Sequence, residues 1–138
     1  MRLRPALLAA ILLCVACART QPNEMSVAVG PGVAASVPAP VASPEATPQI
    51  VRIWLSQDSV TQGDFLRGHV TTSTNVASLE VRLGPRTANM RRTTFGQFEG
   101  SYRIPWVPAF LHRSYTVQVI ARNAAGEATE VRVPVTYR

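Results

Sequence analysis

Apolar and polar residues alternate in short runs over the C-terminal two thirds of the chain. In one run, Leu79, Val81 and Leu83 alternate with Glu80 and Arg82. A period of two predicts strands that bury one face. Six such runs and a weaker one over 88–94 predict seven strands of a sandwich or small barrel, and so an all-β fold class. The six runs lie within 51–55, 65–70, 79–83, 98–104, 115–121 and 131–135.

Turn-forming residues separate these runs. Gly63, Gly84, Gly96 and Gly126 each lie at a boundary between two neighbouring runs. No stretch longer than a turn shows a helical period. One folded domain is therefore expected over 49–138. Pro134 interrupts the last run, and because proline cannot donate to a ladder, that strand is expected at a sheet edge.

Two segments resemble bacterial immunoglobulin-like and fibronectin type III-like domains. They are Tyr115–Gly126, with the pattern Tyr-x-Val-x-Val-x-Ala-x-Asn-x-x-Gly, and the turn Val60–Asp64. The resemblance implies a single seven-stranded antiparallel immunoglobulin-like β-sandwich. It places Tyr115 at a tyrosine corner, with its hydroxyl bonded to the preceding loop. Val117 stands where antibody domains have a cysteine, so no disulfide is implied.

The first 17 residues have the pattern of a secretory signal peptide. Arg2 and Arg4 precede an apolar run over 6–16, which is too short to span a bilayer as a helix. Signal peptidase cleavage at the Ala16-Cys17-Ala18 pattern would release a free protein. Alternatively, 14–17 resembles the lipobox of bacterial lipoproteins, which implies lipidation at Cys17. The chain is thus expected to be exported, either as an outer-membrane lipoprotein or as a periplasmic or secreted protein.

Residues 18–48 are rich in Pro, Ala and Val and contain no aromatic residue. Closely spaced prolines disfavour helix and sheet and favour extended polyproline II. The segment is expected to be a disordered linker, either as a spacer of selected length or simply as a loose terminus.

The chain carries 14 basic and eight acidic residues, a formal net charge of +6, and all of its basic residues are arginine. Arg82, Arg122 and Arg132 are expected on one outer sheet face, where they would form a candidate anion-binding surface for acidic envelope polymers. Glu80 and Glu130 share that face and are expected to pair with some of these arginines. Nucleic acid is not an expected partner, because the chain lacks interleaved stacking aromatics.

The connection over 104–111 is unusually apolar. Trp106, Phe110 and Leu111 could dock a partner, but the favoured interpretation is that they close the open end of the sandwich. Trp54 raises the same question, because its strand directs it outward; it could instead pack under the linker.

No catalytic, cofactor or metal site is expected. His69 and His112 are the only histidines, and their spacing fits no metal motif. A Ser-His-Asp arrangement with Asp58 or Asp64 is compositionally possible, yet no nucleophile elbow is present.

These observations predict a non-catalytic module of the cell envelope that serves protein or glycan binding, adhesion or spacing. Two alternatives remain: an accessory domain or inhibitor of an envelope enzyme, and an arginine-rich surface for acidic polymers. A membrane partner is expected only through a lipid on Cys17.

Overall fold

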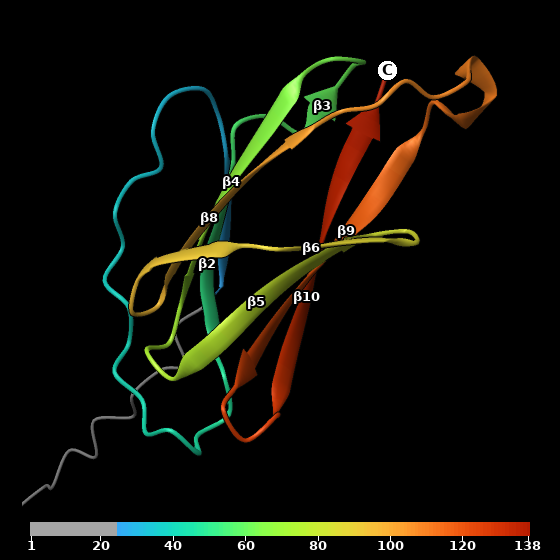
Figure 1. Ribbon diagram of the computed structural model, residues 1–138. Helices are drawn as coiled ribbons and strands as arrows, with labels where there is room; N and C mark the ends of the chain where they lie inside the picture. Colours follow the sequence, from blue (N-terminus) through green and yellow to red (C-terminus); the bar gives the residue numbers. More distant parts are fainter. Residues whose placement is uncertain (1–24) are drawn as a thin grey trace, which may run out of the picture.

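The computed structural model describes residues 25–138, and within them the fold is all-β, as the alternation predicted. Ten strands form two five-stranded sheets that face each other across one apolar core (Figure 1). In sheet A the strand order is β1 (Ser26–Val29), β2 (Ile50–Leu55), β4 (Phe65–Thr72), β8 (Gln97–Arg103) and β7 (Arg91–Thr94). In sheet B it is β3 (Ser59–Val60), β10 (Ala128–Tyr137), β9 (Ser114–Asn123), β5 (Val76–Leu83) and β6 (Arg86–Asn89). The one helical element of this range is the 3-10 turn η1 (Ala109–Leu111).

The number and direction of the strands differ from the expected seven antiparallel strands. The two additional edge strands pair in parallel, β1 with β2 and β3 with β10. Both sheets are therefore mixed. The sequence did not reveal β1 and β3 because each has four residues or fewer, too few to show an alternating pattern.

The weak seventh run is the point at which the chain changes sheets. It breaks at Met90, so that β6 pairs with β5 in sheet B and β7 pairs with β8 in sheet A. The first residue of β7, Arg91, is paired with Glu99. Beyond Glu99, β8 has no neighbour on that side in the described chain, and the space between the two sheets is open there.

The inward residues follow the predicted alternation in most strands. The expectation of a sheet edge at Pro134 also holds locally. The short strand β3 pairs with β10 only at Thr136 and Tyr137, so at Pro134 β10 has β9 as its one neighbour. In β2, however, a bulge between Ile50 and Arg52 places Ile50 rather than Val51 in the core. Side chains from both sheets make up this core: Ile50, Ile53, Leu55, Val60, Val70, Val76, Leu79, Phe98, Ile104, Val117, Val119, Ala121, Val133, Val135 and Tyr137.

The described part of the predicted linker, residues 25–48, is ordered against the domain, contrary to the expectation of disorder. The carbonyl oxygens of Val37 and Pro40 accept hydrogen bonds from the Gln97 side chain (2.9 Å) and the Thr74 N–H (2.9 Å). Pro48 is fully buried. An extended proline-rich chain lacks some N–H donors but presents its carbonyl oxygens, which polar groups of the domain bind. The fold therefore begins well before residue 49.

The predicted signal peptide over 1–17, with Cys17, and linker residues 18–24 lie outside the described residues. Within 25–138, no helix is long and apolar enough to cross a membrane.

Candidate functional site

The three arginines of the predicted anion surface lie on the central strands of sheet B. Arg82 in β5 and Arg132 in β10 are both register partners of Gln118 in β9, and Arg122 lies further along β9. Arg82 forms an ion pair with Glu80 and Arg132 with Glu130, the latter at 2.9 Å. The predicted pairing is confirmed. Two of the three guanidinium groups therefore already bind a carboxylate, which leaves little free charge for an anionic ligand.

The apolar connection presents its two largest side chains to solvent. Trp106 is 65% exposed and Phe110 is 83% exposed, so the interpretation of these two as a core plug is wrong. Ile104 is buried and Val107 packs on the core instead, and Leu111 is half-buried.

A third exposed aromatic residue belongs to the same end of the domain. Phe65, which is 61% exposed, begins β4 and is paired with Arg103, the last residue of β8. The Arg103 guanidinium lies 5.9 Å from the centroid of the Phe65 ring, within the range of a cation–π contact. We call Phe65, Trp106 and Phe110 the distal patch.

The backbone beneath the distal patch is tied to the core by a tyrosine. The Tyr115 hydroxyl donates a hydrogen bond to the carbonyl oxygen of Leu111 at 2.6 Å, as the predicted tyrosine corner requires. The ring of His112 packs against that of Tyr137, a core residue, with the ring centroids 4.6 Å apart and the planes tilted by 49°. The connection is thus fixed at its second half, which holds Phe110 outward on a supported turn.

The residues considered for catalysis are engaged in separate contacts. His69 Nε2 lies 2.7 Å from Gln97 Oε1, and His112 Nε2 lies 3.2 Å from the carbonyl oxygen of Val107. Within residues 25–138, no three His, Cys, Asp or Glu side chains gather in a way that could hold a metal ion.

Asp64 closes the turn after β3. Its Oδ2 accepts hydrogen bonds from the backbone N–H of Thr61 (2.8 Å) and from the Gln57 side chain (3.0 Å). The Thr61 N–H is the main cause that lowers the pKa of Asp64 below its ordinary value. This carboxylate has a structural role in the Val60–Asp64 turn.

Trp54 lies on the outer face of sheet A and is only 8% exposed. It shares a hollow with Gly32, Val33 and Ala34 of the N-terminal segment, which agrees with the expectation that it packs under that segment. The Arg67 guanidinium lies 5.9 Å from its ring centroid and donates to the carbonyl oxygen of Gly32 at 3.2 Å.

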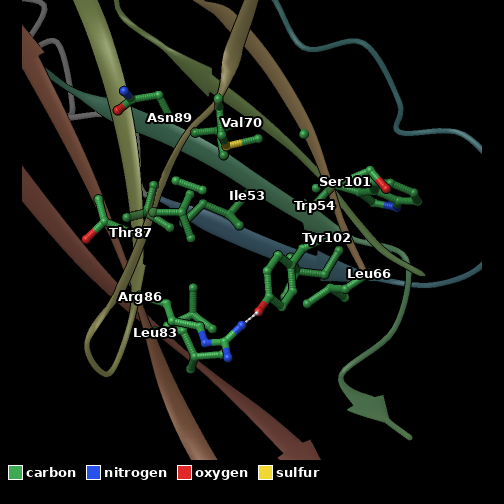
Figure 2. A pocket seen from close by; sticks show the side chains of 18 residues that line it. Ile53, Trp54, Leu66, Val70, Leu83, Arg86, Thr87, Asn89, Ser101 and Tyr102 are labelled. Carbon is green, nitrogen blue, oxygen red and sulfur yellow. Dashed lines mark hydrogen bonds between the residues drawn. The ribbon is translucent and has the colours of Figure 1, made fainter. Parts of the chain in front are cut away.

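An apolar cavity of about 170 Å³ lies between the two sheets, at the side opened by the sheet change at Met90 (Figure 2). The guanidinium of Arg86 in β6 donates to the hydroxyl of Tyr102 in β8 at 2.9 Å, across the opening. Sequence reasoning missed this cavity, because no local pattern brings its six contributing strands together. Its apolar lining includes Ile53, Leu55, Leu66, Val70, Val81, Leu83, Met90, Val117 and Val119.

No protein-family model matches the chain, and no curated protein matches it significantly. Its function is therefore inferred from its residues and their arrangement alone.

Proposed function

We propose that this chain is an exported, non-catalytic immunoglobulin-like module that binds a protein or glycan of the cell envelope through the distal patch. The signal peptide and a lipid on Cys17 are part of this proposal. The domain would be held at the membrane by its N-terminal segment, and the patch would meet the partner.

The strand order supports the immunoglobulin-like part of the proposal. Along sheet A, β2, β4, β8 and β7 occupy the order of the A, B, E and D strands, and in sheet B, β10, β9, β5 and β6 occupy the order G, F, C and C′. The Tyr115–Leu111 hydrogen bond lies where such domains carry their tyrosine corner.

The observation that carries the binding role is the exposure of Trp106 and Phe110 on a supported turn. Solvent exposure of large aromatic side chains on a small domain marks an interaction site, and tryptophan is enriched among the residues that dominate binding energy. A rigid turn loses little conformational entropy when it binds.

The position of the patch fits a membrane-tethered module. The described chain enters sheet A where Ser26 pairs with Arg52, which in turn pairs with Thr71 near the end of β4. The patch lies at the opposite end, where β4 begins and β8 ends. Figure 1 shows the connection after β8 close to the C-terminus, far from the hairpin between β9 and β10. A tether at residue 25 would thus direct the patch away from the anchor.

Site-specific photo-crosslinking in the native host tests this function. A benzoylphenylalanine at position 110 should yield a discrete adduct that is lost in the Trp106→Ser background. The matched control is the same probe at position 95, because Phe95 is also 70% exposed but lies in the turn between β7 and β8. Identical adducts at both positions, or none at position 110, would refute the proposed surface. The adduct would then be identified as protein or glycan by mass.

The proposed export and lipid anchoring of the protein are tested separately. Intact-mass measurement of the mature protein should show a diacyl or triacyl mass increment on a chain that begins at Cys17. A chain that begins at Arg19 without lipid would instead show free secretion.

A further inference from the structure

We propose that the cavity between the sheets binds a single alkyl chain that carries an anionic head group, with the chain inside and the head at Arg86. This site is distinct from the distal patch and does not depend on the proposed function.

The volume and lining of the cavity fit a short alkyl chain. At about 170 Å³ it exceeds the engineered cavity of about 150 Å³ that stays dry and takes up benzene in another protein. Its interior side chains are mostly aliphatic or thioether. The polar residues Thr87 and Asn89 belong to β6 and Ser101 to β8, and Figure 2 shows these two strands on opposite sides of the opening. Such a lining favours hydrocarbon over water.

The opening has a structural cause. The sheet change at Met90 removes the strand that would cover the last residues of β8, so Gly100 and Ser101 line an unpaired edge. Gly100 faces Gly68 across the β4–β8 ladder. A Cβ at either position would make contacts at ordinary van der Waals distances, and at both positions these contacts include the Met90 side chain. This flexible thioether can shift without a change of fold, which would allow a chain to enter.

The charge at the opening selects the head group. Arg86 and Ala88 in β6 are the register partners of Leu83 and Val81, so they share the inward face of sheet B. Among residues 25–138, no carboxylate lies within ion-pair distance of Arg86. Its hydrogen-bond partner is the neutral Tyr102 hydroxyl. A carboxylate or phosphate at this point would bind the guanidinium by charge-assisted hydrogen bonds and could also accept from Tyr102.

Calorimetric titration of the full chain with straight-chain carboxylates from butanoate to decanoate tests the site. Affinity should rise about fourfold per added methylene, as expected for burial of each CH₂, and reach a plateau when the cavity is full. Octanol, which has no charge, should bind at least tenfold more weakly than octanoate.

Two kinds of variant locate the binding. Val81→Phe fills the interior and should abolish the dependence on chain length; Ala88→Phe, at an exposed edge strand, blocks the opening if the first variant does not fold. Arg86→Gln should weaken octanoate roughly tenfold and leave octanol unchanged. Arg138→Gln, which removes an exposed charge outside the cavity lining, is its matched control.

Three results would overturn the inference. Absence of octanoate binding at millimolar concentration, or equal binding to the wild type and both filled variants, would exclude the cavity as the site. Equal affinity for octanol and octanoate would exclude Arg86 as the head-group contact.

Discussion

The side-chain amide of Asn123 donates a hydrogen bond to the carbonyl oxygen of Ala46 at 3.1 Å, across 77 positions of sequence. Its Oδ1 accepts from the N–H of Glu127 at 2.9 Å, which fixes the turn between β9 and β10. Asn75 donates to the same Ala46 oxygen at 2.6 Å. One carbonyl of the proline-rich segment is thus held from two places, the turn between β4 and β5 and the hairpin between β9 and β10.

Asn123→Ala should therefore destabilise the domain by about 1–3 kcal/mol, because it removes the two hydrogen bonds that this buried side chain makes to Ala46 and Glu127. Asn123 is 4% exposed, so water cannot replace these contacts readily. Urea unfolding followed by tryptophan fluorescence measures the change. A loss under 0.5 kcal/mol would show that the Ala46 contact contributes nothing to the fold.

Gly96→Ala should be more disruptive than Gly84→Ala, although both glycines have positive φ angles, 75° and 56°. A Cβ at position 84 meets nothing within 4 Å, so only backbone strain of about 1–2 kcal/mol is expected. At position 96 the Cβ would overlap that of Ala39 and lie 2.6 Å from the Thr72 carbonyl oxygen. We expect a further ~1–3 kcal/mol in thermal or urea unfolding. Equal effects of the two substitutions would mean that neither the Ala39 side chain nor the Thr72 carbonyl oxygen crowds position 96.

Tyr115→Phe removes the hydroxyl that bonds Leu111 and leaves the ring in place. The expected loss of stability is about 0.5–1.5 kcal/mol, with an unchanged urea m-value. Tyr102→Phe is the matched control, because its hydroxyl bonds only the exposed Arg86 and its loss should be close to zero. A larger loss of stability for Tyr102→Phe than for Tyr115→Phe would argue against the Tyr115–Leu111 hydrogen bond as a support of the distal patch.

Asp64 should make stability depend on pH in acid. Its pKa is lowered in the folded state, first by the Thr61 N–H. Its contribution is therefore fully present above the unfolded value near 3.8 and is lost as the pH falls through the lower folded value. The difference in stability between the wild type and Asp64→Ala should be constant from about pH 5 to 7 and shrink below about pH 4. Urea titrations at each pH measure this difference in stability. A difference that grows toward low pH would mean that folding raises the pKa of Asp64 instead of lowering it.

The alternation of apolar and polar residues determined the all-β class, most inward positions and the turns, because a pleated strand with one buried face imposes a period of two locally. The Tyr115 pattern likewise predicted its own hydrogen bond, since both partners lie within four residues. Tertiary structure decided what depends on distant partners. Only there do the carbonyls of residues 25–48 meet the polar groups of the domain, Trp106 and Phe110 stay outside while Ile104 is buried, and the chain changes sheets at Met90. The cavity is the clearest case. Residues of six strands line it, so its existence depends on how distant segments pack and not on the sequence of any one strand.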